Sequence, residues 1–324
     1  AQSAAVNKVC GVYQSPQGDE QLIAELQTLF RAQGLAVGAE HLALISGSQN
    51  ALFLLFNLFA GRATSGEMRK ILLPMVPEYL GYADQSLAAD SFISCLPRVH
   101  KTGPHRFSYQ LDIKALDAIT DALGAVCISS PTNPSGNVVS LDELQALNTW
   151  AKTRQVPLII DRAYGSPFPA LEYPPQPLFY DDNIIQVWSL SKLGLPGLRT
   201  AVVLAQPDVI ALLVKANTIL NLANNNPGPA LMLRLIRSGD LTHITQQLLP
   251  QYYRQQRDTL LHLLAEALAG LNYFICEPKG AFFIWLWLPD LPISSAELYQ
   301  HLKQQGVLVM AGEGFFFEWQ DSWP

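Results

Sequence analysis

Short apolar runs alternate with longer amphipathic stretches through the first two thirds of the chain. The short runs are rich in β-branched residues and predict buried strands at 42–45, 71–73, 125–128, 156–160, 184–188 and 202–204. Apolar residues at helical spacing predict helices at 22–30, 51–59 and 141–153, and helices follow from 207 onward. Ser140 and Glu143 have the spacing of a capping box. Strands and helices in this order are typical of parallel βαβ units, so we expect an α/β fold with a mainly parallel sheet.

The pattern changes at the run NNNPGP, residues 224–229, which interrupts the helices. Beyond it we expect a strand at 282–288, a helix at 295–304 and a last strand at 307–309. We therefore divide the chain into an N-terminal segment at 1–30, a large domain at 31–225 and a smaller α+β domain at 226–324.

The composition indicates a globular protein that hides much of its surface. Hydrophobic residues make up 49% of the 324 residues and charged residues 15%, against roughly 25% charged in an average soluble domain. This excludes a disordered chain. The net charge of −6 argues against a nucleic-acid groove, which needs a basic surface. No apolar run reaches the roughly 18 residues of a transmembrane helix, and the first residues lack a signal-peptide pattern. We therefore expect a soluble, cytoplasmic protein.

The four cysteines lie far apart, without a C-x-x-C pair and without histidines at zinc spacing. They are Cys10, Cys95, Cys127 and Cys276. We expect buried thiols in a reducing compartment and no metal site.

Side chains with useful chemistry follow five of the predicted strands. They lie at 46–49, 77–79, 131–133, 161–164 and 189–192. In open parallel sheets, ligands bind beyond the carboxyl ends of the strands. We therefore expect these five segments to meet at one edge of the sheet.

One part of this edge suits a phosphate group. Gly47 allows a tight turn, and Ser48 and Gln49 would open the next helix, whose free N–H groups and dipole favour an anion. Taken singly, Ser48 is better explained as a helix N-cap and Arg199 as a surface charge. The hydroxyl groups and the permanent positive charge that such a site needs come from Ser189, Ser191 and Arg199.

A second part of the edge suits the ring of pyridoxal phosphate. This cofactor needs a lysine for a Schiff base and an acid that keeps its ring nitrogen protonated, which Lys192 and Asp161 can supply. A structural Lys192–Asp161 ion pair is an equal alternative. Tyr164 and Asn133 can hydrogen-bond a phenolate oxygen, and Tyr79 can stack on the ring. Alternatives are a packed aromatic at Tyr79 and an Asx turn at Asn133. Because suitable groups follow five separate strands, the set as a whole favours a cofactor site over these separate structural roles.

These motifs carry a resemblance. PTNPSG at 131–136, D-x-x-Y at 161–164, and S-x-S-K at 189–192 followed by G-x-R at 197–199 resemble the fold-type I pyridoxal-phosphate-dependent aminotransferases of class I and II. Their order and spacing both match, and the similarity covers nearly the whole chain. The resemblance implies a three-layer α/β/α large domain with a mainly parallel sheet, and a smaller α+β C-terminal domain.

The resemblance also implies a role for each residue. Lys192 would bind pyridoxal 5′-phosphate as a Schiff base and would then carry the proton between the substrate α-carbon and the cofactor carbon. Asp161 would pair with the ring nitrogen. Tyr164 and Asn133 would hold the phenolate oxygen, with Asn133 also reaching the substrate carboxylate. Tyr79 would stack on the ring. At the Gly47 turn, the phosphate would be held by Ser48, Gln49, Ser189, Ser191 and Arg199.

Tyr13 matches a tyrosine that reaches the phosphate of the neighbouring subunit. The resemblance therefore implies a homodimer with shared sites, to whose interface residues 1–30 contribute. Segments at 55–62, 77–84, 189–199 and 283–288 are similar to the branch that transfers the amino group between L-valine or L-alanine and pyruvate or 2-oxoisovalerate. The apolar chain, without a second cationic anchor for a dicarboxylate, agrees with a small aliphatic substrate.

One residue that the resemblance requires is missing. Such aminotransferases usually bind the substrate α-carboxylate with an arginine of the C-terminal domain, and no arginine follows Arg257. We therefore expect the sequence to be the ordered part of a longer protein. The alternative is a true truncation that keeps cofactor binding without full turnover.

Three other kinds of function fit parts of the sequence. Ser189 and Lys192 have the S-x-x-K spacing of penicillin-binding proteins, but K-T-G at 101–103 precedes this motif instead of following it. A C–S lyase, a decarboxylase or an aminotransferase of other specificity would share the cofactor residues and stays open. A pyridoxal-phosphate-binding transcription regulator would need a basic DNA-binding segment, which we do not find.

Overall fold

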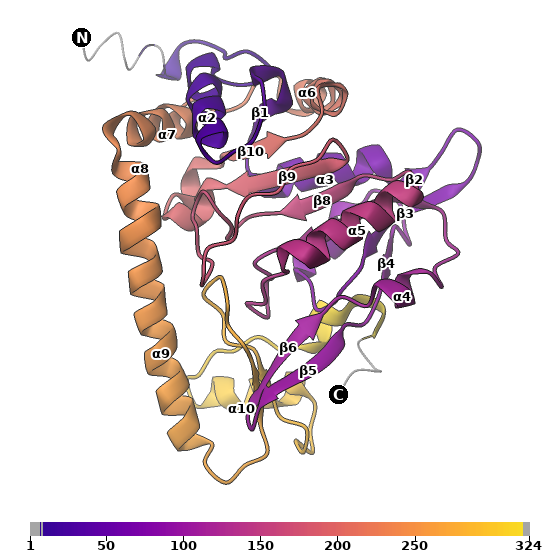
Figure 1. Ribbon diagram of the computed structural model, residues 1–324, viewed down its shortest axis with the longest axis vertical. Coiled ribbons are helices and arrows are strands. Elements are labelled where there is room, and N and C mark those ends of the chain that lie inside the picture. Colours follow the sequence, from indigo (N-terminus) through magenta and orange to yellow (C-terminus); the bar gives the residue numbers. More distant parts are fainter. Residues whose placement is uncertain (1–6, 8, 320–324) are drawn as a thin grey trace.

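The computed structural model describes residue 7 and residues 9–319, and its larger sheet has eight strands (Figure 1). Their order in space is β1-β10-β9-β8-β7-β3-β2, with β4 paired to β3. In that order the strands are β1 (Leu42–Ile45), β10 (Ala201–Leu204), β9 (Ile184–Ser189), β8 (Leu158–Asp161), β7 (Leu123–Ser129), β3 (Met68–Leu73), β2 (Gly61–Arg62) and β4 (Phe92–Ser94).

Strand directions bring the predicted segments to one edge. β9, β8, β7, β3 and β4 pair in parallel. β10 is antiparallel to both β9 and β1, and β2 is antiparallel to β3. The expectation of a mainly parallel sheet is confirmed. The carboxyl ends of β1, β3, β7, β8 and β9 share one edge, and β10 begins there.

Helices cover both faces of the sheet. Side chains alternate between the two faces along each strand, so each face has apolar side chains that a layer of helices buries. Ile45 of β1 packs in one cluster with Leu55 of α3. Its neighbour Leu44 packs on the other side with Leu26 of α2. The three-layer α/β/α architecture is therefore confirmed. The helices are α2 (Glu20–Ala32), α3 (Ser48–Phe59), α4 (Ile113–Leu116), α5 (Leu141–Thr153), α6 (Pro207–Asn221), α7 (Pro227–Ser238), α8 (Asp240–His243), α9 (Leu249–Ala267) and α10 (Ser295–Gln304).

Local signals set several of these helix ends. The capping box of α5 is confirmed, since the Glu143 N–H donates to Ser140 Oγ and the Ser140 N–H donates to Glu143 Oε2. α10 has the same arrangement at Ser294 and Glu297. In the part of the chain that the structure describes, every helix is too short or too polar to cross a membrane.

A smaller sheet has the order β12-β11-β6-β5. Two of its strands come from before residue 225 and two from after it, so the sheet combines both sides of the division that we drew. That division at residues 30 and 225 stays a prediction. Figure 1 shows α9 running from the large sheet toward this small one. The strands are β5 (Arg98–Gly103), β6 (Arg106–Gln110), β11 (Phe274–Cys276) and β12 (Leu286–Trp287).

Two predictions for the C-terminal part are wrong. Residues 307–309 form no strand, and the side chains of Leu308 and Met310 are 74% and 70% exposed. An isolated extended run gains no hydrogen bonds, and no described strand lies beside this one. The strand expected at 282–288 is limited to β12, because Ala281 and Phe282 form a turn.

The cysteines differ in part from the expectation. Cys127 and Cys276 are buried, whereas Cys10 is exposed and Cys95 is half-buried, so the prediction of burial is wrong for these two. All four are free thiols. Burial raises the pKa of the Cys276 thiol to about 12, so this thiol stays protonated at neutral pH.

Candidate active site

The strand ends lie level with one another at the shared edge. Ser129, the last residue of β7, is the register partner of Asp161, the last residue of β8. Ser189, at the end of β9, and Ile45, at the end of β1, both lie opposite Ala201 of β10. The side chains that follow these strands therefore start from one line.

Gly47 forms the turn that leads from β1 into α3. Its φ of 99° and ψ of 152° lie in a region that residues with a Cβ rarely adopt. α3 begins at Ser48 with Gly47 as its N-cap, so the alternative in which Ser48 is only the N-cap is wrong. The first N–H groups of a helix have no acceptor within the helix. They face the edge where the other predicted groups lie.

The side chain of Arg199 lies against this turn. A Cβ built on Gly47 would collide with Arg199 Nη2 and lie 2.9 Å from Arg199 Cζ. Arg199 Nη1 donates to Ser191 Oγ at 3.4 Å, and the Ser191 N–H donates to Ser189 Oγ at 3.2 Å. The structure thus brings together most of the residues predicted to bind phosphate. We call Gly47, Ser48, Ser189, Ser191 and Arg199 the anion site.

Asp161 is a buried carboxyl group with an exposure of 6%. It accepts hydrogen bonds from the Tyr82 O–H at 2.9 Å and the Ala163 N–H at 2.9 Å. Burial raises the pKa of Asp161, while the two hydrogen bonds and the charge of Lys192 act in the opposite direction. We did not predict Tyr82, although its position three residues after Tyr79 places it one helical turn away, in η2 (Leu80–Gln85).

Lys192 follows β9 in the short helix η3 (Leu190–Leu193). Its Nζ lies 5.5 Å from the ring centroid of Tyr164 and 5.8 Å from that of Phe282. Among the described residues, none forms an ion pair or hydrogen bond with this amine. The structural Lys192–Asp161 ion pair is therefore not formed, and the amine remains available.

Tyr164 and Asn133 approach the edge from different loops. Tyr164 is 4% exposed and packs edge-to-face against Phe282 and Phe283, with centroids 5.2 and 5.4 Å away. Burial raises the pKa of its hydroxyl, so that it remains a hydrogen-bond donor. The Asn133 side chain is half-buried and has no hydrogen bond to a described residue. The Asx turn is therefore not formed.

Three further predicted site residues are more exposed than Asp161 and Tyr164. They are Tyr79, Gln49 and Tyr13. The half-buried Tyr79 ring packs edge-to-face on Tyr82 at 5.4 Å, and its hydroxyl donates to Gln49 Oε1 at 3.5 Å. Gln49 is otherwise exposed. Tyr13 is 79% exposed in this single protomer.

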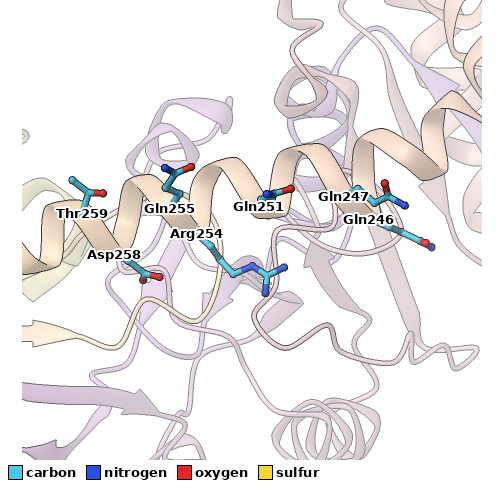
Figure 2. A pocket seen from close by; sticks show the side chains of 7 residues that line it. All are labelled: Gln246, Gln247, Gln251, Arg254, Gln255, Asp258 and Thr259. Carbon is cyan, nitrogen blue, oxygen red and sulfur yellow. The ribbon is translucent and has the colours of Figure 1, made fainter.

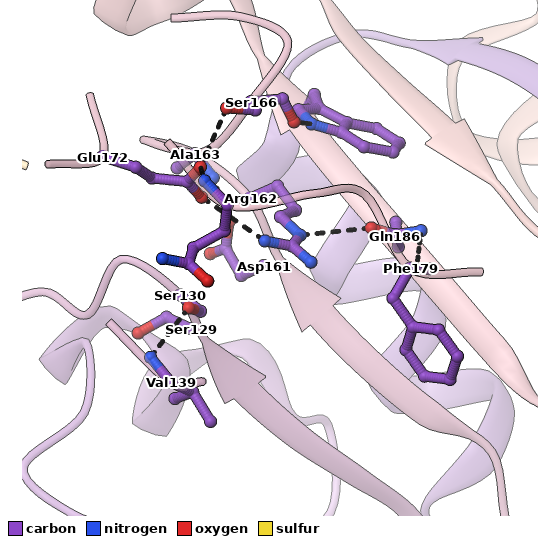
Figure 3. A network of polar contacts seen from close by, with 12 residues as sticks. Ser129, Ser130, Val139, Asp161, Arg162, Ala163, Ser166, Glu172, Phe179 and Gln186 are labelled. Carbon is purple, nitrogen blue, oxygen red and sulfur yellow. Dashed lines mark hydrogen bonds and ion pairs between the residues drawn. The ribbon is translucent and has the colours of Figure 1, made fainter. Parts of the chain in front are cut away.

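A buried polar network, which we did not predict, supports the loop between Asp161 and Tyr164 (Figure 3). Arg162 is 2% exposed, its Nε donates to Gln186 Oε1 at 3.1 Å, and its Nη1 lies 3.4 Å from Glu172 Oε1. The Ser166 O–H also donates to Glu172. Buried charges of this kind are stable only when paired, so the network fixes the path of this loop.

A groove of 740 Å³ lies elsewhere, along η5 (Ile244–Leu248) and α9 (Figure 2). It contains none of the residues predicted for the site. Its walls are mostly amide side chains, and it has no cysteine, histidine or lysine that could act as a nucleophile or base. The lining residues are Gln246, Gln247, Gln251, Arg254, Gln255, Asp258 and Thr259.

The groups at the sheet edge fit pyridoxal phosphate. The anion site offers an arginine, hydroxyl groups and free helix N–H groups to a phosphate. Asp161 offers a buried carboxylate to a protonated ring nitrogen, and Lys192 offers an unpaired amine to an aldehyde. The fold and this donor set are those of a fold-type I pyridoxal-phosphate enzyme.

The comparison with known families agrees. The sequence profile of the family "Aminotransferase class I and II" matches residues 1–323. The chain belongs to this family, and its cofactor is pyridoxal 5′-phosphate. The identification as a pyridoxal-phosphate-dependent aminotransferase of fold type I, made from the motifs, is confirmed.

Individual relatives include a valine–pyruvate aminotransferase from Escherichia coli (strain K12), which is 38% identical over 321 residues. This match covers 99% of the chain and 76% of the relative. A crystal structure of a putative amino-acid aminotransferase from Psychrobacter arcticum 273-4 is also 38% identical, with a TM-score of 0.93 over 97% of this chain and 74% of that one. The valine–pyruvate aminotransferase of Salmonella typhimurium LT2 is 38% identical, with a TM-score of 0.89 over 97% and 79%.

Proposed function

We propose that this protein transfers the amino group of a small aliphatic amino acid to a 2-oxo acid, with L-valine as donor and pyruvate as acceptor. The observation that carries the proposal is the unpaired amine of Lys192 at the same edge as the buried carboxyl of Asp161 and the anion site. The similarity to two valine–pyruvate aminotransferases at 38% identity supports the substrate pair. L-Alanine and 2-oxoisovalerate are the pair for the reverse direction.

Pyridoxal phosphate, when bound, supplies a ring that withdraws electrons from the substrate α-carbon. Asp161 would accept a hydrogen bond from the protonated ring nitrogen, and the donors Tyr82 and Ala163 favour its carboxylate form. Lys192 Nζ would take the proton from the substrate α-carbon as a positioned general base and would then deliver it to the cofactor carbon as a general acid. Asn133 and Tyr164 would donate to the phenolate oxygen.

The surroundings of Lys192 suit an aliphatic side chain. The rings of Tyr164 and Phe282 flank the amine, and Phe282 stacks on Tyr253 with centroids 4.9 Å apart. The Tyr164 ring is buried and the Phe282 ring is 38% exposed, and both present apolar surface without a cation for a second substrate carboxylate. Small apolar amino acids therefore lose little on entering, whereas a dicarboxylate would bury an unpaired charge.

The protein acts as a homodimer in this proposal, with Tyr13 reaching the phosphate of the other subunit and residues 1–30 joining the interface. Large apolar side chains are exposed on the N-terminal segment and at the end of α6. Soluble monomers rarely leave such surfaces uncovered. The most exposed are Tyr13 at 79%, Val12 at 57%, Ile219 at 85% and Leu222 at 60%. Sedimentation equilibrium that gives the mass of one chain would contradict the dimer.

We place the enzyme in the cytoplasm because its four cysteines are free thiols, which persist in a reducing compartment. Cell fractionation with an antibody to the protein tests this. Recovery in an oxidising compartment would contradict it.

A half-reaction tests the catalytic proposal. Purified protein is loaded with pyridoxal phosphate, and L-valine is added without any 2-oxo acid while the visible absorbance is recorded. We expect the absorbance of the bound cofactor to bleach with valine and to return with pyruvate. A parallel sample with L-aspartate should bleach far more slowly. A cofactor band that valine leaves unchanged would refute the substrate assignment and leave the cofactor site standing.

A further inference from the structure

Glu78 is a fully buried carboxyl group that the proposed mechanism does not use. Its exposure is 0%, and it lies in the loop after β3, directly before Tyr79. Glu78 Oε1 accepts the Ser129 N–H at 2.7 Å. Glu78 Oε2 accepts the Ser129 O–H at 2.6 Å and the Tyr79 N–H at 3.2 Å. A buried group with this many partners is a structural junction and not a chance burial.

The junction joins three parts of the molecule. Ser129 ends β7 and is the register partner of Asp161. Tyr79 is the N-cap of η2, and η2 carries Tyr82, whose O–H donates to Asp161. The backbone N–H of Glu78 donates to the Phe315 carbonyl at 3.0 Å, which attaches the C-terminal helix η6 (Glu313–Trp319) to the same point.

We propose that Glu78 is a positioning residue for transamination: its carboxyl group fixes the Tyr79 loop to the end of β7. The proposal rests on the function proposed above, in which Tyr79 stacks on the cofactor ring and Asp161 pairs with its nitrogen. Glu78 acts through these two residues and touches neither cofactor nor substrate.

The charge state of Glu78 suits this role. The titratable groups around it are Asp161 of β8, Tyr82 of η2 and Cys127 of β7. Burial raises the pKa of Glu78 to about 8, and the Asp161 carboxylate adds to the rise, while the bonds from Ser129 and Tyr79 counter it. At neutral pH Glu78 is therefore mainly the neutral acid, and in that form its own O–H donates to Ser129 Oγ across the 2.6 Å contact while the two backbone N–H bonds are kept. It orders the loop without placing a second negative charge beside Asp161.

The chain offers a matched control. Glu143 also accepts from a serine N–H, the same serine O–H and one further backbone N–H, but it does so at the start of α5, where its partners are Ser140 and Leu111. Glu78→Gln keeps the shape and can bond Ser129, but its amide NH₂ cannot accept the Tyr79 N–H. Glu78→Ala loses all three bonds. Glu143→Gln makes the same chemical change away from the strand ends.

The experiment measures the dissociation constant of pyridoxal phosphate by fluorescence, and the circular dichroism of the bound cofactor at saturation. Loss of one net hydrogen bond weakens binding about three- to tenfold, so we expect that change for Glu78→Gln and a larger one for Glu78→Ala. The dichroism band, which reports how the ring is held, should shrink in Glu78→Gln. With valine, kcat should fall while KM stays within about twofold. Glu143→Gln should match wild type in all four quantities.

Identical behaviour of Glu78→Gln and Glu143→Gln would overturn the proposal. If Glu78→Ala does not fold, the Gln variant decides. If the wild-type cofactor band does not respond to valine, the proposed function fails, yet the binding and dichroism measurements still decide the role of Glu78.

Discussion

Replacing Gly47 with alanine probes the anion site through the backbone. The new Cβ would collide with Arg199 Nη2 and lie 2.9 Å from Arg199 Cζ. The guanidinium group is the end of a flexible side chain, so it moves aside. The group then loses its contact with the turn. It also loses the hydrogen bond that Nη1 donates to Ser191 Oγ at 3.4 Å in the wild-type structure. The substitution therefore removes the arginine from the anion site without touching the arginine itself.

Two magnitudes follow from this geometry. At φ 99° and ψ 152° the alanine backbone is strained by about 1–3 kcal/mol, which lowers the free energy of unfolding by that amount. A hydrogen bond to a charged group contributes about 1.5–3 kcal/mol. Losing the arginine–phosphate contact should therefore raise the dissociation constant of pyridoxal phosphate about 10- to 150-fold.

Urea unfolding without cofactor and a binding titration measure the two quantities separately. Pyridoxal, which lacks the phosphate, should bind wild type and Gly47→Ala with equal affinity. Gly239→Ala is the control, because Gly239 has a φ of 80° and nothing within 4 Å of a Cβ. It should lose about 1–2 kcal/mol of stability and no affinity. Wild-type affinity for pyridoxal phosphate in Gly47→Ala, or an equal loss for pyridoxal, would refute the assignment of this site.

Four further predictions concern buried or reactive groups. Lys192→Ala should abolish turnover and keep the fold, and turnover near wild type would remove the mechanism. Asp161→Ala should bind the cofactor but lose most activity, and an undiminished rate would mean that the ring nitrogen has another partner. Arg162→Met should cost about 3–5 kcal/mol in urea unfolding because Glu172 is left buried and unpaired, and a smaller loss on also replacing Glu172 with leucine would confirm the pair. The raised pKa of Glu78 means that the folded state binds its proton more tightly than the unfolded state. The contribution of Glu78 to stability should therefore fall by on the order of 5 kcal/mol as pH rises from about 4.5 to about 8, and a Glu78→Gln variant with the same slope as wild type would contradict this.

The residues at the sheet edge that we propose as the active site could be identified from the sequence. Gly47, Asp161 and Lys192 each follow a short apolar run, and burial of such runs in a parallel sheet places the next residues at the carboxyl edge. This inference needs only the local pattern and the direction of the chain. The capping box at Ser140 and Glu143 was predictable for the same reason, because every group in it lies within four residues.

The partners of the site residues could not be identified in this way. Asp161 accepts a hydrogen bond from Tyr82, which lies 79 residues away in the sequence. Ser129 donates a hydrogen bond to Glu78, which lies 51 residues away. Such pairs depend on how the loop after β3 folds over the ends of β7 and β8. No local pattern encodes that path.

Strand formation in the small sheet shows the same limit. Residues 307–309 are apolar, and Val307 and Val309 are β-branched, but they form no strand. In contrast, β5 (Arg98–Gly103), whose only large apolar residue is Val99, pairs with β6. β propensity reports how well side chains fit a pleated surface, and it yields a strand only where a neighbouring strand supplies the hydrogen bonds. The sequence by itself thus determined which residues stand at the sheet edge. The tertiary structure alone decided which strands found partners and which buried groups hold the site residues in place, because both depend on contacts between segments far apart in the chain.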